Sequence, residues 1–315
     1  MILRIIKSFL YDRWREIDAE SPEAPATESP PPAVSKAERR KRARAADRAQ
    51  RVIPRDPASR SGGDRSGGRA RGEAATVQAG WDFRPLVVLI TVAVSLTLQE
   101  YIGEREFFTR HFPDLAYGEY GELMRHGWWA LWRFLGYVVI PVIVILCMPG
   151  ERVRDYYLSF KNFRSKAGIY LVLFLLILPV VIAAPHLFPN FYLTYPFYKW
   201  ANRSAFDLWA WEAMYAVQFM SLEFFFRGFM LKALRPRFGS YAIFVMVVPY
   251  CMIHYGKPMP ETLGAIVAGT VLGTLAMRTR SIWGGVLIHI AVAITMDMMA
   301  VNHCPPAEVG PCPSH

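Results

Sequence analysis

The chain has 315 residues, a length that would suit about two soluble domains of average size. However, 53% of its residues are apolar and they gather in long runs, which excludes an ordinary pair of soluble domains. Lys and Arg outnumber Asp and Glu by 36 to 26, so the formal net charge is +10. Such an excess is typical of nucleic-acid binding and of a membrane surface alike.

The amino-terminal part of the chain carries nearly all of this positive charge. Residues 36–71 hold 13 Lys or Arg and 4 acidic residues, and they contain no aromatic side chain that could stack on a base. Residues 20–80 are rich in Pro, Ser, Ala and Gly, a composition that buries too little apolar surface to fold. We therefore predict a disordered basic tail that lies on anionic lipid, and we do not expect nucleic acid as a partner. Residues 1–19 place Ile, Phe and Trp at helical spacing, which predicts an interfacial amphipathic helix.

Apolar runs dominate residues 81–300. A bilayer core about 30 Å thick requires about 20 apolar residues in a helix, and seven segments approach that length. The sequence therefore predicts an all-α fold, a polytopic transmembrane helical bundle of about seven spans. In the sixth segment, Ala265, Gly269 and Gly273 recur at four-residue intervals, which favours close helix packing. The segments are 83–101, 128–148, 167–188, 208–226, 240–255, 262–277 and 282–300.

The connections between these segments predict an orientation. Every second connection is strongly basic, as in 149–166 and 227–239, and basic connections stay in the cytoplasm. We therefore expect an integral protein of a bacterial inner membrane, with its amino terminus in the cytoplasm and residues 301–315 outside. In that compartment Cys304 and Cys312 would be able to form a disulfide.

A few ionisable residues fall inside the apolar segments, where each costs several kcal/mol and marks a functional hypothesis. Glu223 and Arg227, in SLEFFFRGFM, are four residues apart and can pair on one helix face. His254 closes the fifth segment and His289 lies in the middle of the seventh. A carboxylate and two imidazoles can activate a water molecule and stabilise an oxyanion.

The same three residue types also leave a cofactor open. Glu223, His254 and His289 match the ligand set of a catalytic zinc ion, so the site uses zinc or no metal at all. A simpler interpretation is that the Glu–Arg pair only neutralises charge near a helix end and that the histidines are packing residues.

These motifs resemble those of the CPBP intramembrane proteases, the group that contains the CAAX prenyl endopeptidases and bacteriocin-processing or immunity proteins. The resemblance covers about residues 206–300. The family motifs are Glu-Glu-x-x-x-Arg, Phe-x-x-x-His and His-x-x-x-Asn/Asp. The resemblance implies a helical fold with its site inside the membrane. It also implies that the first Glu activates water, that the histidines position water or bind metal, and that the final Asn assists the oxyanion.

The chain departs from these motifs at three positions. Leu222 occupies the position of the first Glu, so Glu223 corresponds to the second. Tyr250 replaces the Phe, and Ala293 replaces the final Asn. Either Glu223 has become the base or the domain binds without hydrolysis.

Two function classes follow. The first is an intramembrane endopeptidase that cleaves a membrane-anchored protein or peptide. In it Glu223 is the general base oriented by Arg227, assisted by Glu261 or Asp297, while the two histidines position water, oxyanion or metal. The alternative is a catalytically inactive CPBP-like scaffold or immunity-type binding protein. A proton-coupled transporter is disfavoured because no inverted repeat of broken helices is evident.

Overall fold

The structure is a computed structural model that describes residues 12–19, 82–188 and 191–301. Within these ranges the regular elements are helices, with only an isolated bridge between Leu158 and Ser281, so the predicted all-α class is confirmed. The whole of the predicted basic tail, residues 20–80, and both Cys304 and Cys312 lie outside the described residues.

In the part of the chain that the structure describes, five helical stretches are long and apolar enough to cross a membrane. Two of the seven predicted segments, 208–226 and 240–255, fall on helices outside this group. Segment 208–226 belongs to a continuous helix, which is made of α12 (Ala205–Glu223), the π-helical η4 (Phe224–Met230) and α13 (Leu231–Phe238). Segment 240–255 contains α14 (Ala242–Met252), which has 11 residues. The five stretches are α4 (Arg84–Tyr101), Gly121–Cys147 (α7, Gly121–Phe134; η2, Leu135–Val139; α8, Ile140–Cys147), α10 (Ala167–Leu187), α15 (Met259–Thr279) and α16 (Trp283–Val301).

Short helices occupy the connections. They are α2 (Asp12–Ala19), α5 (Arg105–His111), α6 (Pro113–Ala116), η3 (Val153–Asp155), α9 (Phe160–Arg164), α11 (Phe191–Thr194) and η5 (Gly239–Tyr241).

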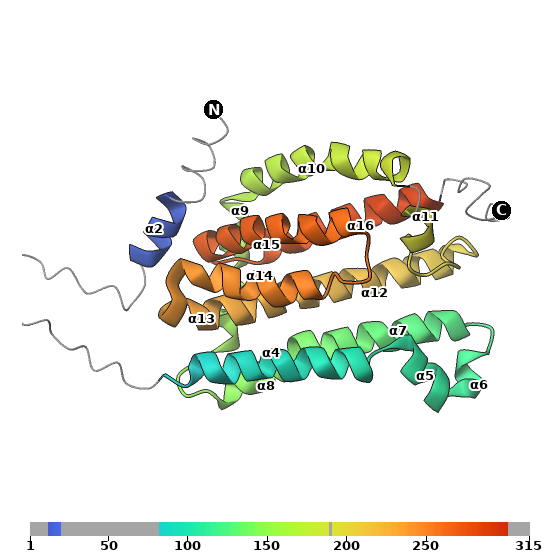
Figure 1. Cartoon of the computed structure of the whole chain (residues 1–315), viewed down its shortest axis with the longest axis horizontal. Coiled ribbons are helices and arrows are strands. Elements are labelled where there is room, and N and C mark those ends of the chain that lie inside the picture. Colours follow the sequence, from blue (N-terminus) through green and yellow to red (C-terminus); the bar gives the residue numbers. More distant parts are fainter. Residues whose placement is uncertain (1–11, 20–81, 189–190, 302–315) are drawn as a thin grey trace, which may run out of the picture. The chain divides into compact units, whose positions relative to one another are not determined.

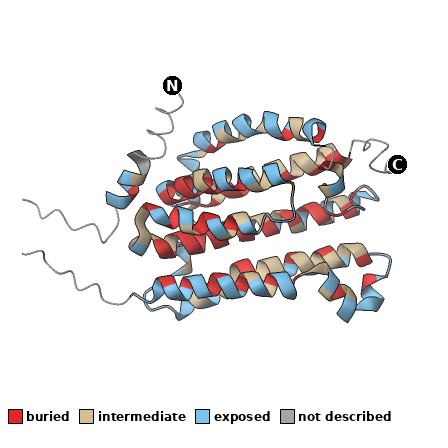
Figure 2. Cartoon of the chain, in the orientation of Figure 1, coloured by how far each residue is buried: buried red, intermediate tan, exposed pale blue. Residues whose placement is uncertain are grey.

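Helix α12 lies at the centre of the bundle, between α4, α7 and α8 on one side and α14, α15 and α16 on the other (Figure 1). Burial follows this arrangement, because buried residues concentrate on α12, η4 and α13, whereas α10 is largely exposed (Figure 2). Exposed side chains of α10 are themselves apolar, such as Leu175 and Leu176. An apolar exterior is the expected face of a helix that is solvated by lipid.

Small residues allow the close helix packing that the four-residue spacing predicted, and the structure identifies α14 as the partner of α15. A Cβ atom added at Gly269 would lie 3.0 Å from Cδ1 of Tyr250, and one added at Gly273 would lie 3.0 Å from Cε of Met246. The absence of side chains at these glycines therefore lets the helices approach closely and lets the Tyr250 ring pack against Gly269.

Helix α2 packs against the bundle. Trp14 Nε1 donates to Thr274 Oγ1 at 3.2 Å, and Ile17 is buried. Asp18 accepts hydrogen bonds from the backbone N–H and the hydroxyl of Ser240, at 2.6 and 3.0 Å. The described part of the predicted interfacial helix therefore has a defined docking position on α15 and η5.

Candidate active site

The π-helical turn after α12 carries a buried ion pair. Glu223 is 1% exposed and Arg227 is 0% exposed, and Arg227 Nη1 lies 3.1 Å from Glu223 Oε1. The Arg227 guanidinium also lies 4.0 Å from the centroid of the Tyr250 ring, a cation–π distance. The predicted pairing of Glu223 with Arg227 is confirmed. Insertions of this π type are frequent at functional sites.

His289 extends this pair from the facing helix α16. Its Nδ1 lies 2.8 Å from Glu223 Oε1, and its Nε2 lies 3.1 Å from the hydroxyl of Tyr250. Gly285, one turn earlier on α16, makes the approach possible, because a Cβ atom there would collide with the Glu223 carboxylate. Arg227, Glu223, His289 and Tyr250 therefore form one connected polar cluster.

A cavity of about 330 Å³ lies beside this cluster. Its wall is mainly apolar, and it receives residues from α10, α12, α14, α15 and α16. Leu222 lines the cavity, whereas its neighbour Glu223 does not. Consecutive residues of a helix point about 100° apart, which accounts for this division. The polar lining residues are Tyr195, Tyr215, Tyr250, His254, Lys257, Glu261 and His289.

His254 presents an unprotonated nitrogen to this site. Its Nδ1 lies 2.7 Å from the backbone carbonyl of Tyr250, so Nδ1 carries the proton and Nε2 is an acceptor in the neutral ring. The backbone carbonyl of His254 accepts a hydrogen bond from Thr262 Oγ1 at 2.9 Å. Gly256 follows with φ of 88°, a left-handed conformation that glycine allows and that ends the run before α15. The predicted break after His254 therefore fixes one imidazole at the cavity wall.

Of the two acidic residues expected to assist, Glu261 reaches the cavity. Lys257 Nζ donates to Glu261 Oε1 at 2.6 Å, and the Tyr195 hydroxyl donates to Glu261 Oε2 at 2.7 Å. Asp297 instead accepts from Trp211 Nε1 at 2.6 Å in the packed interior and does not line the cavity. Glu261 is thus the acidic side chain that shares the cavity with His254 and His289.

The predicted metal ligands do not form a recognisable cluster. Among residues 12–19, 82–188 and 191–301, no group of three or more His, Cys, Asp or Glu side chains could hold a metal ion. The role of Glu223, His254 and His289 as a ligand set stays a prediction.

Two contacts of the site were not anticipated from the sequence. The Tyr250 hydroxyl meets His289, and Tyr195, from the segment after α11, holds Glu261. The sequence carried one signal for the first, since Tyr250 stands at the aromatic position of the His254 motif. No pattern connected Tyr195 with a residue 66 positions away.

Fold and site together define a helical membrane protein in which two imidazoles from different helices line one apolar cavity. Residues 204–295, less than a third of the chain, match the family model described as type II CAAX prenyl endopeptidase, Rce1-like. This match agrees with the resemblance that the motifs indicated, and the matched segment contains every site residue from Leu222 to Ala293. No curated protein and no solved structure matches the chain.

Proposed function

We propose that this CAAX-protease-like membrane protein is an intramembrane endopeptidase that hydrolyses a peptide bond of a membrane-anchored protein or peptide. The observation that supports this function is the shared cavity, to which His254 and His289 both contribute within an apolar wall. An apolar cavity that opens among lipid-facing helices suits a substrate with a lipid anchor or an apolar segment.

The geometry favours a division of roles between the two histidines. His254 Nε2 takes a proton from water as its oxygen attacks the carbonyl carbon, and it returns the proton to the leaving amine when the C–N bond breaks. The Tyr250 hydroxyl, which lines the cavity and lies 3.1 Å from His289 Nε2, can turn to donate to the oxyanion, while the Glu223 carboxylate holds His289 through Nδ1. Glu223 acts through His289 as a positioning residue, because Leu222 occupies the cavity side of α12.

The test is cleavage of membrane-anchored peptides in proteoliposomes, followed by mass spectrometry of new termini. We expect His254→Gln to lower cleavage by about 10²- to 10⁴-fold, the usual contribution of a general base. His111→Gln, on the exposed end of α5, is the matched control and should keep full activity. Undiminished cleavage by the His254→Gln protein would refute this mechanism.

A second function is a binding protein that does not hydrolyse its partner. Leu222 and Ala293 favour it, because both line the cavity at positions where the family motifs have Glu and Asn. In that case the natural chain should cleave no membrane peptide but should retain one through detergent extraction. Cleavage by the natural chain would exclude this function, whereas cleavage that appears only in the Leu222→Glu, Ala293→Asn variant would support it.

We also propose that the chain lies in a bacterial inner membrane with its amino terminus in the cytoplasm, and that anionic lipid binds its basic tail. The basic connections support this orientation. The test uses single-cysteine variants in a cysteine-free background and an impermeant maleimide added to intact spheroplasts. Tyr117 and Arg237 are both exposed, and the connections that contain them are predicted to lie outside the cell and in the cytoplasm, respectively. The maleimide should therefore label Tyr117→Cys and not Arg237→Cys. The reverse labelling would invert the orientation.

A further inference from the structure

A second, smaller cavity of about 70 Å³ adjoins the first. Its volume suits a few water molecules or one peptide unit. Trp129 and Arg133 of α7 and Gln218 of α12 contribute to its lining, and the large cavity does not include them. Five residues line both cavities, namely Tyr215, Phe219, Leu222, His254 and Lys257. His254 is therefore shared between an apolar cavity and a more polar one.

Gln218 brings an unsatisfied acceptor to the small cavity. The residue is 6% exposed, and its Oε1 has no hydrogen-bond partner among the described residues. A buried polar atom without a partner costs about 1–3 kcal/mol. Because Gln218 lines the small cavity, its carboxamide can meet a donor, an N–H or an O–H, from a molecule that enters the cavity.

Arg133 brings a donor that the surrounding helices hold in place. Its Nη1 donates to Gln99 Oε1 at 3.1 Å, and Gln99 Nε2 in turn donates to the hydroxyl of Ser95 at 3.0 Å. Ser95 Oγ donates to the carbonyl of Gly136 at 2.6 Å, which ties the chain of contacts to η2. The guanidinium also lies 5.5 Å from the Trp129 ring centroid. Arg133 is thus a preorganised cationic donor rather than a free surface side chain.

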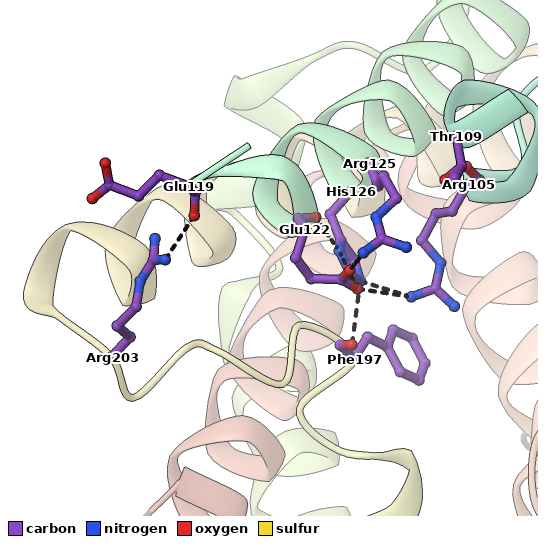
Figure 3. Close-up of polar contacts among 8 residues, drawn as sticks. All are labelled: Arg105, Thr109, Glu119, Glu122, Arg125, His126, Phe197 and Arg203. Carbon is purple, nitrogen blue, oxygen red and sulfur yellow. Dashed lines mark hydrogen bonds and ion pairs between the residues drawn. The ribbon is translucent and has the colours of Figure 1, made fainter. Parts of the chain in front are cut away.

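The connection that closes the small cavity is fixed at the start of α7 (Figure 3). His126 Nδ1 lies 2.8 Å from the carbonyl of Glu122, and His126 Nε2 lies 3.2 Å from both Arg105 Nη1 and the carbonyl of Phe197. Glu122 additionally pairs with Arg105 and Arg125. Because this cluster anchors Phe197, which lines the small cavity, this part of the cavity wall is also held in place.

We propose that the small cavity binds one peptide unit of an extended segment, with Gln218 Oε1 accepting its N–H and Arg133 donating to its carbonyl oxygen. An acceptor and a cationic donor in one small space match the two polar groups of a peptide bond. The segment then runs past His254, with its apolar or lipid-linked part in the large cavity. This inference extends the proposed function to its substrate class, but it requires only binding and not hydrolysis.

The test is photo-crosslinking of the full chain in detergent micelles. The probe is an N-palmitoyl tetrapeptide that contains one photoactivatable leucine, and three analogues each replace a different backbone amide with an ester, which removes one N–H. For the amide probe, Gln218→Leu should lower crosslinking about five- to tenfold, the effect of one lost hydrogen bond. For the ester analogue at the recognised position, Gln218→Leu should cause no further loss.

Val217→Leu, at the exposed neighbouring position of α12, is the matched control and should crosslink like the natural chain. An equal loss of all four probes on Gln218→Leu would overturn the proposal, because it would indicate a general effect on packing. No loss with any probe would also overturn it, because Gln218 would then make no contact with the peptide. Because crosslinked intact peptide is counted, absence of cleavage would refute the proposed hydrolysis and leave this inference standing.

Discussion

The two sides of α12 differ sharply where it reaches Glu223. On one side, Glu223 and Arg227 are buried and do not line the cavity, and their contact with it runs through His289, which pairs with Glu223 and does line the cavity. On the other side, Leu222 faces the cavity together with His254. The comparison shows that the most costly charges of the chain are held in a packed interior, while the groups with room for a substrate are imidazoles and the more exposed Glu261.

This difference follows from the physics of buried charge. An ion pair in a low-dielectric interior contributes little net stability, but one partner without the other is strongly destabilising. Glu223 and Arg227 must therefore stay together, and His289 gains a fixed orientation from them. The cavity side of α12 contains no such ion pair. We therefore expect a substitution there to change what binds in the cavity more than it changes the free energy of unfolding.

The largest expected effect comes from breaking the packed side. Arg227→Leu leaves the Glu223 carboxylate buried with only His289, and we expect a loss of about 3–5 kcal/mol in the free energy of unfolding. The double variant Glu223→Gln, Arg227→Leu should recover part of that loss. Unfolding in mixed micelles of increasing sodium dodecyl sulfate measures both. Arg237→Ala, at an exposed position of α13, should have no effect, and a similar loss there would remove the contrast between the two regions.

Gly285→Ala tests how tightly the packed side is filled. The added Cβ atom would meet the Glu223 carboxylate, so we expect a destabilisation of about 1–3 kcal/mol. Gly264→Ala is the matched control on α15, because nothing lies within 4 Å of an added Cβ there. That control should be neutral or slightly stabilising, since Ala favours a helix over Gly. Equal behaviour of the two variants in the same unfolding assay would show that the packed side has spare room.

Tyr250→Phe removes the hydroxyl that links the packed side to the cavity. The hydrogen bond of this hydroxyl to His289 Nε2 should contribute about 1 kcal/mol to the free energy of unfolding, which Tyr250→Phe removes. The control Tyr241→Phe, at an exposed position, should leave the free energy of unfolding unchanged. We expect the same substitution to lower the cleavage rate, because His289 loses its partner at the cavity wall. Unchanged stability and rate in Tyr250→Phe would mean that the two regions act independently.

The smallest effect lies outside the spans, at Glu151. Burial raises the pKa of the Glu151 carboxyl, but the hydrogen bond and charge of Lys232 outweigh burial, so its pKa lies below its ordinary value. A lowered carboxyl pKa adds stability above the ordinary pKa of about 4.3, and this stability is lost as the pH falls through the lowered value. Glu151→Gln should therefore cost about 1 kcal/mol or less at pH 7, and nothing at the most acidic pH at which the fold survives. The measurement is a pH series of unfolding midpoints in detergent for the natural chain and the Glu151→Gln variant. A difference between the two that persists in acid would contradict the role given to Glu151.

Much of the fold was predictable because a membrane permits few kinds of secondary structure. Apolar runs of about 20 residues specify helices, since no water is present to satisfy an exposed backbone. Gly269 and Gly273 indicated that their helix packs closely against a neighbour, but they did not indicate that the neighbour is α14. The bounds of two predicted segments were harder to place. Glu212, Glu223 and Arg227 interrupt the apolar run around α12, and α14 is only 11 residues long.

The site was only partly predictable. The Glu223–Arg227 pair follows from helical spacing, and His254 and His289 stand out because an imidazole in an apolar run is costly. The sequence did not indicate that Leu222 rather than Glu223 faces the cavity, because the absolute rotation of a helix depends on its neighbours. The contacts of Tyr195 with Glu261 and of Arg133 with Gln99 join residues far apart in the chain, and no local pattern encodes them.

The sequence by itself determined the all-α membrane architecture, the family resemblance of residues 206–300 and the short inventory of polar residues that could act. These properties depend on composition and on spacing along single helices. Only the tertiary structure decided which of those polar groups share a cavity and which are sealed behind it. That decision rests on how α12 is rotated against α16 and α7, and the rotation is set by packing among all the helices at once.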